Sequence, residues 1–267
     1  MKKLFIQSIL SVALFLGIWL VLKQINWVAI FKTQEISEKT EGKLGEVFWN
    51  AFKVNEKENN DPFIISTVDS IVTKICSANK IERNQIKFHI LDKDEVNAFT
   101  LPNGHLVIYS GLIVNSDNQE QFSGVICHEI AHIKLKHVIK KLIKELGFSV
   151  IISMTTGSYG SEAIKSTVKK LSSSAFDRSL EKEADIMAVD YLINAKINPV
   201  NFSNFLNKLS DKENDISKYL SWINTHPESK ERAKYIIEYS RGRKVINDET
   251  VTKETWAEIK NKLKQLD

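Results

Sequence analysis

Cysteine is scarce in this chain of 267 residues. It contains two cysteines, Cys76 and Cys127, and they do not form a CxxC pair. Two isolated thiols cannot build a disulfide framework or a thiolate zinc knuckle, so any metal site must use histidine and carboxylate ligands. Cys127 stands directly before His128 and invites interpretation as a nucleophile. A small buried residue on a core helix is the commoner role for such a cysteine.

The chain also lacks an excess of charge of one sign. It has 37 basic and 33 acidic residues, a net charge of +4, and both kinds are spread along the sequence. This pattern is typical of a solvated surface and not of a basic arm that binds nucleic acid. We therefore expect no nucleic-acid partner. We find no internal repeat.

Long apolar runs are absent except near the start of the chain. After Lys2 and Lys3, an uncharged run of 19 residues extends from Leu4 to Leu22. At ~1.5 Å per residue, a helix of this length crosses a bilayer core. A cleaved signal peptide would end in small residues, whereas this run ends in bulky ones, and no cysteine follows it for lipidation. We expect an uncleaved membrane anchor, with its flank, over residues 1–32.

The charges beside this run indicate its orientation. Lys2 and Lys3 favour a cytoplasmic N-terminus, although Lys23 and Lys32 on the other side weaken the bias. The rest of the chain would then lie outside the cytoplasm, in the periplasm or an equivalent extracytoplasmic space. Residues 33–62 read as a tether that ends in a short amphipathic helix, and we expect the folded domain over residues 63–267.

The spacing of apolar residues predicts a helix-rich α+β domain with a small sheet. Intervals of three and four residues predict helices over residues 63–79, 120–146, 176–194, 199–209, 228–239 and 253–266. Alternation predicts strands over residues 86–91 and 106–109, the second directly after the turn Pro102-Asn103-Gly104.

The segment from Gly147 to Gly157 is uncharged and rich in large apolar residues. It is too short to span a membrane. Two interpretations stay open at this point. It is either a buried or mobile connection between two helices, or a contact with the bilayer surface near the functional site.

The most informative motif is His128-Glu129-Ile130-Ala131-His132, which lies inside a predicted helix. Histidines four residues apart project from one helix face and can hold one ion. A catalytic zinc site needs three protein ligands and an open position for water, whose pKa the metal lowers. Glu129 would stand beside that water as the general base, taking its proton and passing it to the leaving amine. Chance produces this pattern in on the order of one chain of this size in a hundred.

The third ligand determines the class of site. His137 follows His128 by nine residues, which on a continuous helix puts it on the opposite side, and no glycine precedes it as the longer histidine motif requires. We expect a structural role for it. Glu181 and Asp185 share one face of a later helix with small apolar residues, so Glu181 can bind zinc while Asp185 accepts the N–H of a ligand histidine. Acidic residues at this spacing are also common on solvated helices.

With these pieces in place, the chain resembles the membrane-associated zinc peptidases that include HtpX and the CAAX prenyl proteases. The resemblance covers residues 63–239 approximately. The matching pieces, in order, are Val96-Asn97-Ala98-Phe99, Pro102-Asn103-Gly104, Tyr109-Ser110-Gly111-Leu112, the HExxH helix with His137, Arg178, Glu181, Ala184-Asp185, Thr225-His226-Pro227 and Arg232. This chain differs from HtpX and the prenyl proteases in having one terminal apolar segment, and it is closest to the BepA-like branch with a soluble catalytic domain.

The resemblance implies a zincin-like metallopeptidase domain of the gluzincin type. It implies one Zn²⁺ per chain held by His128, His132 and Glu181, with Glu129 as the base. It also implies a metalloendopeptidase that cuts protein or peptide substrates, in general terms for envelope protein quality control. The alternative is a chaperone-like or scaffold module that keeps the zinc site and rarely cuts. The oligomeric state stays open.

Two further features concern the substrate. A peptide presented to the metal must be extended, and the strand from His105 to Tyr109 is a candidate for pairing with it, bordered by Asn97, Ala98 and Gly104. An ordinary edge strand explains the same pattern. Thr225-His226-Pro227 predicts a loop ahead of a helix, because proline restricts the residue before it. His226 there is an oxyanion donor, a plug on the open zinc position, or a cap of the following helix.

Overall fold

The computed structural model describes residues 36–265 except 212–215, 244, 246 and 247, together with residues 7, 10–12, 14–17 and 19. The chain forms two compact units, Met1–Ser37 and Glu38–Asp267. The expected membrane anchor lies mostly outside the described residues. In the part of the chain that is described, no helix has both the length and the apolar character needed to cross a bilayer.

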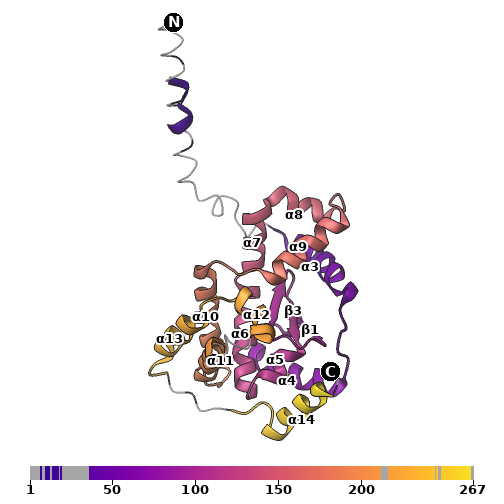
Figure 1. The fold of residues 1–267 in the computed structure, drawn as a ribbon, viewed down its shortest axis with the longest axis vertical. Coiled ribbons are helices and arrows are strands. Elements are labelled where there is room, and N and C mark those ends of the chain that lie inside the picture. The colour runs from indigo at the N-terminus through magenta and orange to yellow at the C-terminus, as the bar shows by residue number, and fades with distance from the viewer. Residues whose placement is uncertain are drawn as a thin grey trace. The chain divides into compact units, whose positions relative to one another are not determined.

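A three-stranded sheet lies beside the central helices of the larger unit (Figure 1). Its strands are β1 (Lys87–Leu91), β2 (Ala98–Leu101) and β3 (His105–Tyr109), in the order β1-β3-β2. β3 pairs in parallel with β1 and antiparallel with β2. The two expected strands are confirmed with small shifts of their starts, whereas β2 was not predicted. β3 is therefore the central strand and not an edge strand.

The turn between β2 and β3 explains the register of this hairpin. Asn103 and Gly104 both have left-handed backbone conformations, with φ of 63° and 74°. A Cβ at Gly104 would lie 1.9 Å from the carbonyl oxygen of Gln85, so only glycine fits against the 3-10 turn at Arg83–Gln85.

Two helices at the centre of the domain carry the HExxH motif and the later acidic pair. These are α6 (Gln119–Lys134) and α10 (Arg178–Asn194). Asn118 caps α6 by accepting a hydrogen bond from the backbone N–H of Gln121 at 2.8 Å. On its other side α6 packs on α11 (Val200–Asp211), where a Cβ at Gly124 would lie 2.5 Å from Cβ of Phe202. This close contact fixes the HExxH helix in the core.

The expected helix over residues 120–146 is wrong as a single element. α6 ends at Lys134, and a second helix, α7 (His137–Leu146), begins after Lys136, whose φ of 55° is left-handed. The chain changes direction at this residue, so the nine-residue spacing does not put His137 on the far side of the motif. No proline or glycine marks the break.

The start of the larger unit also differs from expectation. α3 (Glu38–Phe52) belongs to the larger unit and buries Leu44, Phe48 and Trp49, so the compact unit starts at Glu38 and not at residue 63.

The apolar segment after Gly147 forms α8 (Phe148–Thr155), and α9 (Ser161–Ser173) follows. Both pack on α3. α9 was missed, although Ile164, Val168 and Leu171 carry its helical spacing.

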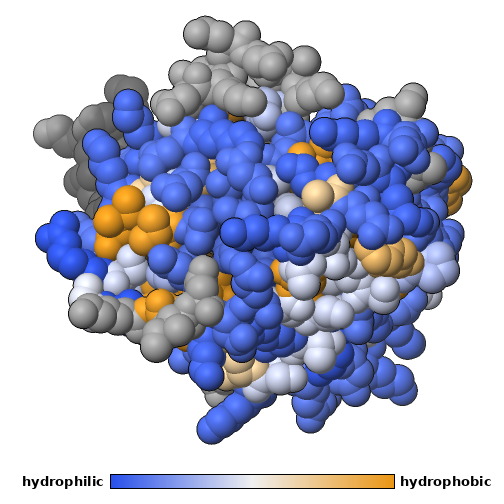
Figure 2. Space-filling model, turned by 90° about the horizontal axis from the view of Figure 1, so that it is seen from below, coloured by the Kyte–Doolittle hydropathy of each residue, from blue (hydrophilic) through white to orange (hydrophobic). Residues whose placement is uncertain are grey.

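The remaining elements complete the shell around the core. They are the helices α4 (Pro62–Ala78), α5 (Ser110–Asn115), α12 (Ile216–Thr225), α13 (Ser229–Ser240) and α14 (Lys253–Lys264), and the 3-10 turn Lys53–Asn55. The predicted helices over 63–79, 176–194, 199–209, 228–239 and 253–266 are confirmed within a few residues, and α5 and α12 are additional. Seen from below, the surface is largely hydrophilic with separate apolar patches (Figure 2). The helix-rich α+β class is confirmed.

Candidate metal centre

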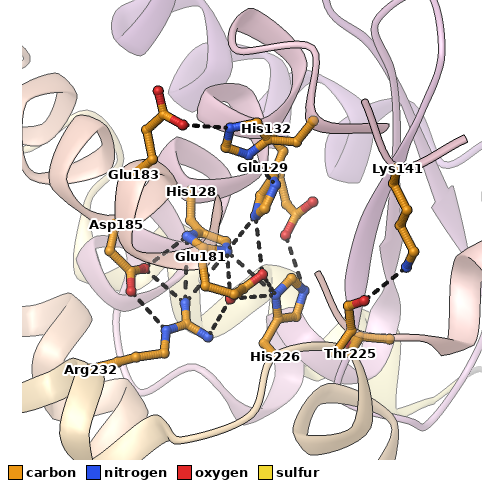
Figure 3. A network of polar contacts seen from close by, with 12 residues as sticks. His128, Glu129, His132, Lys141, Glu181, Glu183, Asp185, Thr225, His226 and Arg232 are labelled. Carbon is orange, nitrogen blue, oxygen red and sulfur yellow. Dashed lines mark hydrogen bonds and ion pairs between the residues drawn. The ribbon is translucent and has the colours of Figure 1, made fainter. Parts of the chain in front are cut away.

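Four side chains from three parts of the fold converge on one point in the core (Figure 3). α6 presents His128 and His132, α10 presents Glu181, and His226 comes from the loop between α12 and α13. One ligand atom from each lies within 4.8 Å of all the others. In the described part of the chain no other group of three or more histidine, cysteine or acidic side chains is arranged in this way.

The separations of these atoms suit a small cation. Nε2 of His132 lies 3.0 Å from Nε2 of His128, and the two carboxylate oxygens of Glu181 lie 3.4 Å and 3.6 Å from these nitrogens. Nδ1 of His226 lies 3.4 Å from Nε2 of His128. Tetrahedral ligands at zinc's bond lengths would be separated by about 3.3 Å. The donor set therefore fits a tetrahedral metal ion.

His226 is held inside the cluster by the end of α12. Its backbone N–H donates to the carbonyl of Trp222 at 2.7 Å, and its ring packs at 4.2 Å between centroids on the Trp222 indole. Nε2 of His226 lies 3.4 Å from a carboxylate oxygen of Glu129. The residue at the start of α13 in the N-cap position is Glu228. The predicted loop is confirmed, and the His226 ring faces the cluster and does not cap α13.

His128 is oriented by a buried charge network from α10 and α13. Its Nδ1 lies 2.8 Å from an oxygen of Asp185, so Nδ1–H donates there and Nε2 is left for the metal. Arg232 donates two hydrogen bonds of 2.8 Å to the same carboxylate, and Tyr235 donates a third. Arg232 also lies 2.9 Å from Glu181. The expected role of Asp185 as partner of a ligand histidine agrees with this geometry.

His132 is oriented by a second chain of hydrogen bonds. Its Nδ1 lies 3.0 Å from Nδ1 of His137, and Nε2 of His137 lies 3.2 Å from a carboxylate oxygen of Glu183. If Nε2–H of His137 donates to Glu183, Nδ1 of His137 accepts from His132, and Nε2 of His132 faces the centre. His137 thus stands behind a candidate ligand, and it is not among the converging atoms.

The electrostatics of the buried network favour a cation. Glu129, Glu181 and Asp185 are buried carboxyl groups, and Arg232 is the buried guanidinium among them. Burial raises the pKa of Glu129 well above its usual value, and the Glu181 charge adds to this. Burial also opposes ionisation of Glu181, yet the charges of His226 and Arg232 hold the pKa of Glu181 well below its usual range. With all three carboxyl groups ionised, the network carries two unbalanced negative charges, which a divalent cation would neutralise.

The centre is closed to solvent in this structure. His128, Glu129 and His132 are 0% exposed, His226 is 1% exposed and Glu181 3%. Neither carboxylate oxygen of Glu129 has a hydrogen-bond partner among the described residues. Buried polar atoms of this kind are rarely left without a partner. A carboxylate without a hydrogen-bond partner beside His128, His132 and Glu181 is what a metal centre with three protein ligands and a bound water requires.

The residues expected to border a substrate groove lie elsewhere or are already engaged. Asn97 is fully buried and donates to Ser221 Oγ at 2.8 Å, while Thr225 donates to it at 3.4 Å, so it supports the chain just ahead of His226. Ala98 is buried in β2. Gly104 packs in its turn against Gln85.

His105 is the clearest correction. It lies in a cluster with His89, Trp49 and Glu46, 3.0 Å from His89 and 3.4 Å from Glu46. Because β3 is paired along both edges, it cannot receive a substrate strand. The expected groove along His105 to Tyr109 is therefore wrong.

Several residues that build the centre were not predicted from the sequence, or were noted only as part of the family pattern. Arg232 was one matching piece with no assigned contact, and Tyr235, three residues later on the same helix face, shares its partner Asp185. Phe176 stacks on His132 with centroids 4.2 Å apart, and Trp222 packs on His226. The spacing of Arg232 and Tyr235, three residues apart on one helix face, could have identified both residues. No pattern in the sequence points to Phe176 or Trp222.

The sequence is similar to those of several known metalloproteases and related proteases. The beta-barrel assembly-enhancing protease of Escherichia coli strain K12 is 25% identical over 200 residues, which cover 70% of this chain and 41% of that protein. The metalloprotease LoiP of the same strain is 30% identical over 174 residues, covering 62% of this chain and 68% of LoiP. Bovine mitochondrial metalloendopeptidase OMA1 is 29% identical over 162 residues, covering 55% and 31%.

The matches cover most of this chain but a smaller part of some of its relatives. The aligned parts are only 40% and 41% of the assembly-enhancing proteases of Yersinia pestis and E. coli, so this chain corresponds to about two fifths of those relatives. The family model for peptidase family M48 matches residues 65–240 and thus includes α6, α10 and the His226 loop. That match spans more than half of the sequence, and the chain belongs to peptidase family M48.

Proposed function

We propose that this protein is a zinc metalloendopeptidase that hydrolyses peptide bonds of protein substrates. The observation that carries the proposal is the convergence of His128, His132 and Glu181, with the Glu129 carboxylate, which has no hydrogen-bond partner among the described residues, beside them. Histidine nitrogens with one carboxylate form a ligand set of catalytic zinc, whereas calcium and magnesium prefer oxygen. Membership of a peptidase family supports proteolysis over the alternative of a chaperone-like zinc module.

The chain's own residues supply the proton chemistry of this proposal. His128, His132 and Glu181 would hold the zinc ion, which would supply an acidified water molecule and a Lewis acid for the substrate carbonyl. Glu129 takes the proton of the water and returns it to the leaving amine. Asp185 and His137 hold the two histidines in the required tautomers. Arg232 balances part of the charge of Glu181 and Asp185.

The sheet suggests how an extended substrate is received. Among the described strands β2 pairs only with β3, so its other edge carries no strand, and β2 packs on α6. A peptide that adds to this edge would pass close to the HExxH helix. Ala98 would then contribute backbone groups, which replaces the expected groove along β3.

We place the protease at a membrane, with the catalytic unit outside the cytoplasm and a role in envelope protein quality control. The uncharged run from Leu4 to Leu22 supports the anchor, and Lys2 and Lys3 support the orientation. The name of the E. coli relative, beta-barrel assembly-enhancing protease, supports an envelope role.

Replacing Glu181 by Ala should remove the metal. Without its one anionic ligand the centre should bind zinc far more weakly, and we expect a loss of affinity greater than about 100-fold. Elemental analysis of the purified protein should give one zinc per wild-type chain and almost none for Glu181→Ala. Asp190→Ala, which removes a surface carboxylate of the same helix, is the control and should keep its zinc. Full occupancy in Glu181→Ala would remove this residue from the ligand set.

Replacing Glu129 by Gln should keep the zinc and abolish cleavage. The amide has nearly the same shape but cannot take a proton from water, so kcat should fall by about 10²–10⁴. Peptide hydrolysis and zinc content measured on the same sample test this. Glu120→Gln, at the start of the same helix, should behave like the wild type. Turnover of Glu129→Gln near the wild-type rate would point to another base.

Replacing His226 by Ala should raise basal cleavage of a short peptide by several-fold. The ring stands where a fourth ligand would stand, which favours the plug over the helix cap. If His226 is instead the oxyanion donor, kcat falls by about 10²–10³. A lower melting temperature with unchanged kinetics would leave only a structural role. Steady-state kinetics and thermal unfolding of one preparation separate these results.

Protease added to spheroplasts should digest the catalytic unit. The basic residues before the apolar run keep the N-terminus in the cytoplasm, so the catalytic unit on the other side of the run is exported. A cytoplasmic marker protein in the same cells serves as the control for lysis. Full protection of residues 38–267 in intact spheroplasts would reverse the proposed orientation.

A further inference from the structure

Lys141 is a buried lysine that the proposed chemistry does not use. It lies on α7, is 7% exposed, and donates to the carbonyl of Ser174 at 2.6 Å, the hydroxyl of Ser174 at 2.8 Å and the carbonyl of Ala175 at 3.0 Å. These three bonds use all the protons of an ammonium group, and none of them goes to a carboxylate. Burying a lysine is costly, so this arrangement calls for a reason.

The acceptors belong to residues 174–178, which are the connection between α9 and α10 together with the first residue of α10, and which we call the strap. Its middle residue, Phe176, stacks on the His132 ring with centroids 4.2 Å apart and an interplanar angle of 24°. The ammonium of Lys141 lies 4.8 Å from the centroid of the same Phe176 ring. Lys141 therefore contacts both the backbone that leads into Phe176 and the ring that covers a candidate zinc ligand (Figure 3 shows Lys141 beside the network).

The strap also reaches the loop that carries His226. Arg178, its last residue, forms an ion pair with Glu228, two residues after His226. Asp177 pairs with Lys144 on α7 at 2.7 Å. Both of these pairs are substantially exposed and contribute little to holding the strap. The buried Lys141 bonds are the strong attachment, because their loss leaves two carbonyls and a hydroxyl without their donor.

We propose that Lys141 is a positioning residue of the metal centre, which fixes the strap so that Phe176 stays packed over His132. The inference rests on the proposed zinc function. In this role Lys141 acts through Phe176, which shields the His132 side of the centre and keeps that ring in the orientation set by His137. The simpler alternative is a lysine that only caps the end of α9, where Ser174 is the C-cap residue.

The test uses the full chain and Lys141→Met, which keeps the apolar stem and removes the three donors. Hydrogen–deuterium exchange should show amides of residues 174–177 exchanging about tenfold faster, with α6 and α10 unchanged. Transfer of zinc to a competing chelator should be about three- to tenfold faster, because Phe176 no longer covers His132. Lys141→Arg should restore part of both properties, and Lys140→Met on the same helix should match the wild type.

A second variant keeps the test decisive if Lys141→Met folds poorly. Phe176→Ala removes a partly exposed ring and should speed zinc transfer, while the amide exchange of Ser174 and Ala175 stays like the wild type. In the double variant Lys141→Met/Phe176→Ala, zinc transfer should be no faster than in Phe176→Ala alone, because Lys141 acts through that ring.

Three results would overturn the inference. These are wild-type zinc transfer in Phe176→Ala, additive effects in the double variant, and faster exchange in Lys141→Met that spreads evenly over the domain. The last result would leave Lys141 as a cap and nothing more. A wild-type chain that binds no zinc would instead defeat the proposed function, and exchange of the zinc-free proteins would still show whether Lys141 holds the strap.

Discussion

The arrangement of charge around Arg232 is the constraint on which the rest of this domain depends. One guanidinium reaches both Glu181 and Asp185 in a region that excludes solvent, and Asp185 in turn fixes His128. Buried carboxylates are stable only when they are paired and hydrogen-bonded. The packing of α10 between α6 and α13 supplies these partners. The same packing that buries the charges therefore also aligns the metal ligands.

The break after α6 has an equally direct effect on the centre. Because Lys136 takes a left-handed conformation, His137 returns to touch His132, and α7 leaves at an angle that brings Lys141 to the strap. In a straight helix through residues 120–146, His137 would lie away from His132 and Lys141 would lie away from the strap. One residue in an uncommon conformation thus connects the motif helix to the elements that cover it.

Sequence reasoning predicted the positions of side chains correctly where a local helical pattern determines them. The HExxH spacing and the Glu181–Asp185 spacing each follow from helical geometry, and both pairs are found on the faces expected of them. It failed where contacts depend on tertiary structure. β2 is short and fully buried, so its sequence shows no alternation, and without it β3 was taken for an edge strand that His105 would help to line. Lys136 could not be recognised as a break, since lysine favours a continuing helix.

The wide separation of the ligands along the chain has a consequence for folding. His226 lies 98 residues after His128 and 45 residues after Glu181. A cation held by all of them would act as a cross-link that closes long loops and is absent from the unfolded chain. Such a link stabilises the native state by about 1.4 kcal/mol for each tenfold rise in free metal above the dissociation constant. The lifetime of the folded domain would then follow the metal supply of its compartment, and starvation for the ion would expose the protease itself to degradation.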